Sequence, residues 1–352
     1  MTRDEYRRIL ERTAPGTPLR EALDRVVQLG TGGLVVIADR EVVAPIIAAG
    51  FELNSPFTPQ SLAELCKMDR AVVVDEGLKT ILYANAHLVP DPNIPSAETG
   101  TRHRVAEQTA KQIERPVIAI SEERKKITIY YKSWRYELKD PLALSSQASQ
   151  ALLILDRYRR ELHELLTELA PMEFERKVPL DHVAMVVQKA VQMIHLEEEL
   201  KDLFVELGKE GKLLKHQLRG LMRGVRETLK LVVLDFRKAQ DRPVEEVIGE
   251  ILALDPEEVL VPEVILKTLG YSEDELESPV PSRGFRLLSK IPRLPPSIIE
   301  RLVEELGSLD QIERANRRQL QRIKGIAETR ARAIKSGLAR LRNRYISGGL
   351  ER

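Results

Sequence analysis

The sequence contains one cysteine, Cys66, among 352 residues, and only 4% of its residues are aromatic. A single cysteine excludes an internal disulfide framework and a CxxC metal site, and it is typical of proteins of the reducing cytoplasm. No window reaches the roughly eighteen consecutive apolar residues of a membrane-spanning helix. The N-terminal segment MTRDEYRRIL has charges and no apolar core, which excludes a secretory signal. We therefore expect a cytoplasmic protein with no membrane partner.

Charge is distributed unevenly along the chain, although the net charge is only +1. Residues 286–352 contain 16 Lys and Arg against 7 Asp and Glu, whereas the preceding residues contain 39 and 47. The basic C-terminal segment indicates an anionic partner that the rest of the chain does not share. A hydrophobic content of 43% with 31% charged residues is typical of a folded protein, and 352 residues predict two or three domains.

The N-terminal part has the pattern of an α/β domain. Short β-branched apolar runs alternate with helical stretches, which predicts a mixed sheet flanked by helices over residues 1–142. The expected strands are 32–38, 71–74, 81–84, 116–120 and 127–131.

Helical periodicity dominates the rest of the chain. Apolar residues recur at helical spacing over 147–169, 183–207 and 213–237, which predicts an all-α, elongated spacer domain at 143–283. Two further helical units, 296–306 and 317–341, each follow a turn. The turn IKGIAETRA at 323–331 has the form of a helix-hairpin-helix element. We therefore expect an all-α DNA-binding domain at 284–352.

Reactive side chains are densest in the segment ETGTRHR at 98–104, directly before an expected helix. Arginines in the first turn of a helix oppose its dipole, which favours an anion at that end. Free backbone N–H groups, the Thr101 hydroxyl and the guanidinium groups of Arg102 and Arg104 would form a cradle for a polyphosphate. The alternative is an exposed basic helix start that pairs with nearby glutamates.

A second candidate is Asp69, which directly precedes the expected strand 71–74. A carboxylate in this place suits a divalent cation or a hydroxyl group that is to be activated. The alternative is a solvated aspartate at a strand end. The segment 30–33 (GTGG) has neither the spacing of a dinucleotide-binding loop nor the lysine of a Walker loop.

The segments TGTRHR (99–104), MDRA (68–71) and YANAHL (83–88) resemble the diadenylate cyclase domain. The order of parts resembles that of the bacterial DNA-integrity-scanning family, which adds a C-terminal helix-hairpin-helix domain. The resemblance implies that two protomers face each other with one ATP each, and that two ATP become cyclic di-AMP and two pyrophosphates. It also implies Mg²⁺ or Mn²⁺, a homo-octamer made from two tetramers, and binding of branched or damaged DNA, which regulates the cyclase in DNA repair.

The resemblance assigns roles to individual residues of this chain. The catalytic group comprises Asp69, Arg102, His103 and Arg104, with Asp69 as the metal ligand. The ATP-binding set comprises Asp69, Arg70, Ala71, Leu88, Thr101, Arg102, His103, Arg104, Val105, Ser121 and Arg124. The DNA-binding set comprises Lys324, Gly325, Ile326, Ala327, Arg330, Arg332 and Lys335, which would contact phosphates without reading bases.

Two positions depart from the family pattern. Arg70 stands where the DGA motif has glycine, and Ala327 stands where the hairpin usually has a second glycine. The sequence leaves open whether the Arg70 side chain blocks the nucleotide, reaches a phosphate or points to solvent. An alternative function is therefore a catalytically weakened, oligomeric DNA-binding scaffold. A third is a structural protein whose basic terminus docks an acidic partner.

Overall fold

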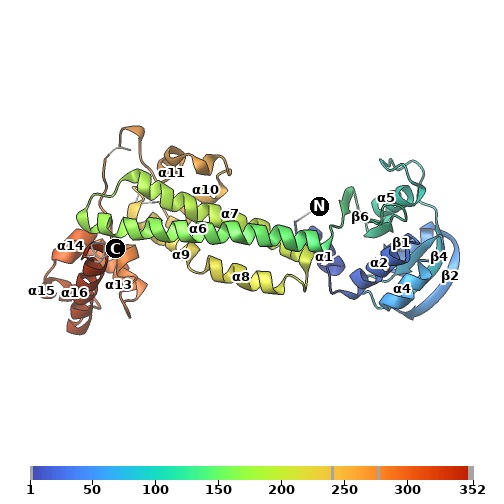
Figure 1. Ribbon diagram of the computed structural model, residues 1–352, viewed down its shortest axis with the longest axis horizontal. Coiled ribbons are helices and arrows are strands. Elements are labelled where there is room, and N and C mark those ends of the chain that lie inside the picture. Colours follow the sequence, from blue (N-terminus) through green and yellow to red (C-terminus); the bar gives the residue numbers. More distant parts are fainter. Residues whose placement is uncertain (1–2, 239–241, 276–277, 348–352) are drawn as a thin grey trace. The chain divides into compact units, whose positions relative to one another are not determined.

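The computed structural model describes residues 3–238, 242–275 and 278–347 of the chain (Figure 1). Its contacts divide into two compact units. The N-terminal unit comprises Met1–Ser149 and Lys201–Lys215, and the C-terminal unit comprises Gln150–Leu200 and His216–Arg352. Domain boundaries at 142 and 283 stay predictions. In the part of the chain that is described, no helix is long and apolar enough to span a membrane.

The N-terminal unit is built on a seven-stranded sheet with the order β2-β4-β3-β1-β5-β6-β7. β1 pairs in parallel with β3, and all other neighbours are antiparallel, so the expected mixed sheet is confirmed. The strands are β1 (Gly33–Ile37), β2 (Ile47–Pro56), β3 (Ala71–Val74), β4 (Thr80–Leu88), β5 (Val117–Ile120), β6 (Ile127–Tyr131) and β7 (Trp134–Glu137).

Successive residues of a strand point to opposite sides of the sheet. Because every residue of β1, β3 and β5 is buried, helices cover both faces. Side chains of α1 (Arg3–Thr13), α2 (Pro18–Leu29) and α4 (Pro59–Leu65) pack on one face. Side chains of α3 (Arg40–Val43), the short helix η1 (Ala44–Ile46) and α5 (Thr101–Ile113) pack on the other. Two strands, β2 and β7, are not among those expected from the sequence. β2 is a largely exposed edge strand and β7 has only four residues, so neither has an apolar run.

Helices make up most of the middle region, as expected. They are α6 (Pro141–Glu175), α7 (Leu180–Leu207), α8 (Lys212–Met222), α9 (Val225–Phe236), α10 (Val244–Ala253) and α11 (Pro262–Thr268), with short turns η2 (Glu258–Leu260) and η3 (Glu273–Glu275). The single helix expected at 213–237 was wrong, because Gly224 takes a left-handed backbone conformation (φ 76°) that ends α8 and starts α9.

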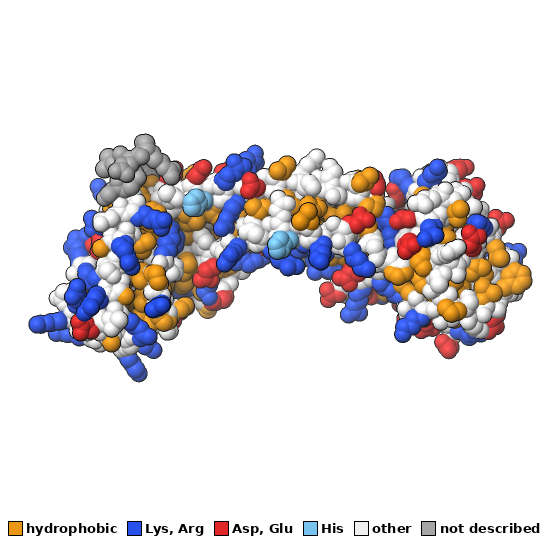
Figure 2. All heavy atoms as spheres, turned by 60° about the horizontal axis from the view of Figure 1, so that its bottom comes forward, with side chains coloured by type: hydrophobic (Ala, Val, Ile, Leu, Met, Phe, Trp, Pro, Cys, Tyr) orange, Lys and Arg blue, Asp and Glu red, His pale blue; other side chains and the backbone are white. Residues whose placement is uncertain are grey.

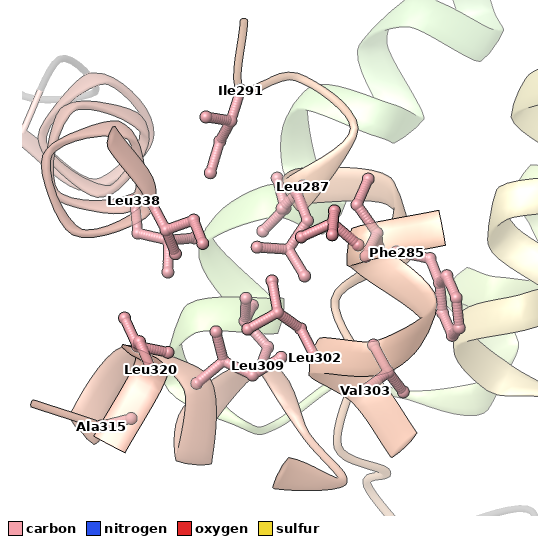
Figure 3. Packing of buried hydrophobic residues seen from close by; sticks show 14 of the residues in the cluster. Phe285, Leu287, Ile291, Leu302, Val303, Leu309, Ala315, Leu320 and Leu338 are labelled. Carbon is pink, nitrogen blue, oxygen red and sulfur yellow. The ribbon is translucent and has the colours of Figure 1, made fainter. Parts of the chain in front are cut away.

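The C-terminal helices are α12 (Phe285–Leu288), α13 (Pro296–Leu306), α14 (Leu309–Arg314), α15 (Arg317–Gln321), α16 (Glu328–Arg342) and η4 (Asn343–Ser347). The segment expected as a helical unit at 317–341 contains two helices, α15 and α16, separated at Gly325 by the hairpin turn that the sequence placed at 323–331. Leu287, Leu302, Leu320 and Leu338 meet in the core of these helices (Figure 3). Ala170 and Phe174 of α6 belong to the same apolar cluster, so the hairpin helices share their core with the middle region.

Buried polar groups join α9 to the start of α12. The Asp235 carboxylate accepts hydrogen bonds from the backbone N–H groups of Gly284 (2.7 Å), Phe285 (2.6 Å) and Arg286 (2.9 Å). In return, the Arg283 guanidinium donates to the backbone carbonyls of Leu234 (3.3 Å) and Arg237 (2.7 Å) at the end of α9. Each helix end thus supplies the cap that the other lacks.

A buried ion pair lies beside these caps. The Arg286 guanidinium contacts the Glu173 carboxylate of α6, and both side chains are almost completely buried. Ser282 Oγ donates a further hydrogen bond to Glu173 at 3.1 Å. Removing one partner of such a pair leaves an uncompensated buried charge. The ion pair therefore joins α6 to the start of α12 within the C-terminal unit.

Candidate functional site

The floor of the candidate site lies where three neighbouring strands meet. The register pairs Leu34 of β1 with Ala71 of β3, and Ala71 with Ala86 of β4. Two of these three side chains are single methyl groups, which leaves space between the sheet and the start of α5. The result is a pocket of about 320 Å³. Its volume is at the lower end of the range for small-molecule sites.

Seven of the eleven predicted ATP-binding residues line this pocket. They are Asp69, Arg70, Ala71, Leu88, Thr101, Arg102 and Val105. Leu34, Ala86 and His87 complete the wall. The segments 68–71, 83–88 and 99–104 are far apart in sequence, and the fold brings all three to one hollow. The pocket has an apolar floor, two guanidinium groups and one carboxylate.

The start of α5 has no side-chain cap. Its N-cap residue is Gly100, and no side chain of the described residues hydrogen-bonds there. The first N–H groups of a helix need such an acceptor, and the helix dipole favours an anion in this place. Thr101 and Arg102 on the pocket wall stand at the same end. The site therefore offers an anion both backbone donors and a guanidinium group.

Gly32, just before β1, leaves the space in which the Arg102 guanidinium lies. Arg102 Nη1 is 3.4 Å from the Ile120 carbonyl oxygen, and a Cβ on Gly32 would be only 2.3 Å from the same nitrogen. Gly32 also has a left-handed backbone conformation (φ 64°). This supporting role of the segment 30–33 was not expected from the sequence. The sequence signal is the pair of glycines directly ahead of a buried strand.

Four predicted ATP-binding residues do not line the pocket: His103, Arg104, Ser121 and Arg124. Arg104 is exposed on α5, and His103 turns toward β6. Ser121 Oγ accepts a hydrogen bond from the Arg124 backbone N–H at 3.2 Å, in the turn between β5 and β6. Contacts of all eleven predicted residues with nucleotide stay predictions.

His103 ends a chain of hydrogen bonds. Its Nδ1 is 2.8 Å from the Tyr130 hydroxyl, which is 2.8 Å from Glu98 Oε1. Arg135 Nε donates to the same carboxylate oxygen at 2.6 Å. Burial lowers the pKa of His103, and nearby arginines, including Arg102, lower it further against the opposing charge of Glu98.

The pKa values of Glu98 and Tyr130 are shifted in opposite directions. Burial acts to raise the pKa of Glu98, but the hydrogen bonds from Tyr130 and Arg135 outweigh it and hold the pKa below its ordinary value. Burial and the neighbouring carboxylate raise the pKa of Tyr130. At neutral pH, Glu98 is therefore ionised and Tyr130 keeps its proton.

A divalent cation would find one carboxylate in the pocket, that of Asp69. No cluster of three or more metal-ligating side chains occurs among the described residues. Mg²⁺ commonly binds one or two carboxylates together with water and substrate phosphates, and it does not need a cage made entirely by protein. Asp69 therefore fits a metal that arrives with a polyphosphate.

Arg70 lines the pocket and is exposed. Among the described residues, those with a left-handed backbone do not include Arg70, so the backbone at this position does not require glycine. The pocket remains hollow with the arginine side chain in its wall. Its guanidinium adds a second positive charge beside Arg102.

A second candidate surface lies on the C-terminal helices, where Figure 2 shows Lys and Arg side chains gathered at the left of the view. Gly325 forms the hairpin turn with a left-handed backbone (φ 92°), and Ile326 is buried below it. Ala327 is the N-cap of α16 and has no side chain able to cap it. Lys324 is exposed, and its side chain has no partner among the described residues.

The other predicted DNA-binding side chains bond within the protein. Arg330 Nη1 donates to the Gly325 carbonyl at 2.5 Å, and Arg332 pairs with Glu328 at 2.9 Å. Lys335 Nζ donates to the Glu313 carbonyl. Arg330, although exposed, thus links the hairpin turn to α16.

The turn expected before 296–306 is a first hairpin of the same form, and this form was not expected from the sequence. The turn at 291–295 has Arg293 in a left-handed conformation (φ 60°) where the second hairpin has Gly325. The Leu294 N–H bonds to the Ile291 carbonyl at 3.3 Å, and the Ile326 N–H bonds to the Ile323 carbonyl at 3.1 Å. The signal is the repeat of I-P-R-L as I-K-G-I, which is hidden because the first copy has no glycine.

Comparison with known proteins assigns the three regions. Residues 20–134 match the family described as DisA bacterial checkpoint controller nucleotide-binding, and residues 138–277 match its linker region. Residues 285–340 match the SAM-like helix-hairpin-helix tandem. The DNA integrity scanning protein DisA of Carboxydothermus hydrogenoformans is 41% identical over 336 residues, 95% of this chain and 96% of the relative. This chain belongs to the DisA family.

A second DisA relative supports the assignment. The DNA integrity scanning protein DisA of Acidothermus cellulolyticus is 40% identical over 343 residues, 96% of this chain and 93% of the relative. The resemblance inferred from sequence is therefore confirmed. The DisA nucleotide-binding match contains every residue that lines the pocket, and the tandem match contains both hairpins.

Proposed function

We propose that this protein is a diadenylate cyclase that condenses two ATP molecules into cyclic di-AMP and two pyrophosphates. The observation that carries the proposal is the uncapped start of α5, where Thr101 and Arg102 face a pocket that also holds Asp69. Leu34, Ala71 and Leu88 provide apolar surface for the adenosine. The first N–H groups of α5 and the Arg102 guanidinium then bind the triphosphate.

The chemistry depends mainly on alignment and charge neutralisation. The 3′-hydroxyl oxygen of one ATP attacks the α-phosphorus of the other, the bond to pyrophosphate breaks, and the hydroxyl proton passes to Asp69 or solvent. A second attack in the opposite direction closes the ring. Asp69 would hold Mg²⁺ or Mn²⁺, which supplies neutralisation of phosphate charge when bound.

One pocket holds one ATP, so the reaction requires two protomers with their pockets face to face. We therefore propose an even-numbered homo-oligomer, the octamer implied by the family. A protein held as a monomer should bind ATP without producing cyclic di-AMP. Sedimentation of the full chain, followed by assay of each species, tests this requirement.

DNA is the second proposed ligand. The hairpin at Gly325, the exposed Lys324 and the excess of positive charge over residues 286–352 favour contact with DNA phosphates. We propose that the protein binds branched or damaged DNA without reading its sequence, and that bound DNA regulates the cyclase.

The decisive experiment incubates the full chain with ATP and Mn²⁺ and measures cyclic di-AMP by mass spectrometry. Arg102→Ala should lower ATP affinity about tenfold or more, because a charge-assisted hydrogen bond contributes about 1.5 to 3 kcal/mol. Arg25→Ala is the control: Arg25 is exposed on α2 and pairs with Glu21 at 2.9 Å. Equal ATP affinity in both variants would contradict the proposal.

Arg70 is tested in the same assay. The wild-type chain should produce cyclic di-AMP, and Arg70→Gly should change the rate without creating the activity. If only Arg70→Gly produces cyclic di-AMP, the arginine has disabled the pocket. The scaffold alternative would then replace the enzyme.

A further inference from the structure

The hydrogen-bond chain behind α5 determines which imidazole nitrogen of His103 carries a proton. We infer that Glu98, Tyr130 and Arg135 are positioning residues that keep the proton on His103 Nδ1, so that Nε2 takes up a second proton from solvent when a polyphosphate binds. The inference rests on the proposed nucleotide site.

The direction of each hydrogen bond follows from the groups involved. Glu98 is ionised and can only accept, and it also receives a hydrogen bond from Arg135. The Tyr130 hydroxyl has one hydrogen, which must go to Glu98 because two lone pairs would otherwise face each other at 2.8 Å. The hydroxyl oxygen then has only lone pairs for His103. His103 Nδ1, at 2.8 Å, is therefore the donor.

The fold holds this chain in place. Tyr130 is almost fully buried in β6, and Glu98 lies in the loop just before α5. Glu107 of α5 fixes that loop by accepting hydrogen bonds from Ser96 Oγ (2.6 Å) and the Ala97 N–H (3.1 Å). The imidazole therefore has little freedom to turn over and exchange its two nitrogens.

Fixing the proton on Nδ1 makes Nε2 the nitrogen that titrates. The charged groups facing the imidazole are Glu98 of the loop, Arg102 of α5, Arg124 of the β5–β6 turn and Arg135 of β7. Three of these four are cations and, together with burial, they keep the imidazole neutral when no anion is present. A polyphosphate at the start of α5 reverses the balance, and the imidazole then gains a proton and a positive charge.

Histidine tautomers can be measured directly in the full chain labelled with ¹⁵N-histidine. The chain has six histidines, and the signal lost in His103→Gln identifies His103. The nucleotide-free wild type should show the Nδ1–H tautomer. Tyr130→Phe should release it to a mixture. Tyr131→Phe is the matched control, because the neighbouring hydroxyl bonds to Glu5 at 3.1 Å.

Proton uptake is measured by calorimetry with a non-hydrolysable ATP analogue and Mg²⁺ in buffers of different ionisation enthalpy. The wild type should take up as much as one proton, and its affinity should fall by up to about tenfold per pH unit above neutrality. His103→Gln should remove both effects.

The two measurements separate the possible failures. An Nε2–H tautomer in the wild type, or no change of tautomer in Tyr130→Phe, overturns the hydrogen-bond chain, whether or not the nucleotide binds. Binding of the analogue without proton uptake overturns the role of Nε2. If the analogue does not bind at all, the proposed function fails, and the tautomer spectrum still decides whether the chain exists.

Discussion

The first N–H groups of α5 and of α12 lack a cap from the preceding residue, and the two helices differ in what caps them instead. Each helix follows a glycine, Gly100 or Gly284, whose missing side chain cannot cap it. At α12, Asp235 from a distant helix accepts three backbone N–H bonds and the site is buried. At α5, no described side chain does so, and arginines follow instead. The capped helix start is a structural joint, by which we mean the contact of Asp235 with the N–H groups of residues 284–286. A helix start left uncapped beside cations is instead available to an external anion.

The largest expected effect is at the capped helix. Asp235→Ala leaves the buried N–H groups of Phe285 and Arg286 without an acceptor, and Gly284 keeps only its hydrogen bond to Ser282 Oγ at 3.1 Å. The change should destabilise the C-terminal unit by about 3 to 5 kcal/mol. Chemical denaturation of the full chain measures the loss. Asp274→Ala removes an exposed carboxylate and should change stability by less than about 0.5 kcal/mol. Equal midpoints for the two variants would show that the joint contributes nothing.

At the uncapped helix, Gly32→Ala should displace Arg102. The new Cβ conflicts with a flexible guanidinium, so the protein should fold at a cost of about 1 to 2 kcal/mol for the left-handed backbone. ATP affinity should fall about tenfold with the lost contact. Gly30→Ala is the matched control, because Gly30 has φ 70° and a Cβ added to it would meet nothing within 4 Å. Equal nucleotide affinity in both variants would separate Gly32 from the site.

The stability that this joint contributes should also depend on pH. Burial raises the pKa of Asp235 to about 7, above its ordinary value of 3.8, and the neighbouring Glu173 adds to the effect. The folded state therefore binds this proton more tightly than the unfolded state does. The resulting stability is complete below about pH 4 and is lost as pH rises through about 7. Denaturation across this range should show the decline in wild type and a flatter profile in Asp235→Asn.

The smallest expected effect concerns the hairpin that begins α16, which is also uncapped. Lys324→Ala should weaken binding to all DNA sequences alike and reduce the slope of affinity against salt concentration by about one. Arg332→Ala should change the slope less, because Arg332 already pairs with Glu328. Fluorescence anisotropy with a branched and a linear DNA at several salt concentrations provides both slopes. A loss confined to one DNA sequence would contradict phosphate contact.

Sequence patterns predicted the parts of the fold that depend on residues close together in sequence. Buried strands such as β1 and β3 have unbroken apolar runs, and the α5 segment combines glycine, threonine and arginine in one turn. The edge strand β2 lacks such a run and was missed. The first hairpin was missed because Arg293 adopts the conformation for which glycine is the usual signal.

Other features depend on contacts between distant segments, which no local pattern reveals. The meeting of Asp69 with Arg102 was expected from the family resemblance, and the pocket brings both together. The role of Gly32 follows from a side chain 70 positions later in the chain, at Arg102. Likewise, His103 turns toward Tyr130 because the fold places β6 behind α5.

The exchange of caps between α9 and α12 bears on how this protein can be divided. Asp235 and the N–H group of Gly284 are 49 positions apart, so a hairpin fragment that starts near 284 loses the carboxylate that completes its first turn. Such a fragment would begin with frayed ends and an exposed apolar side. Grafting the hairpins onto another protein therefore requires α9 to travel with them.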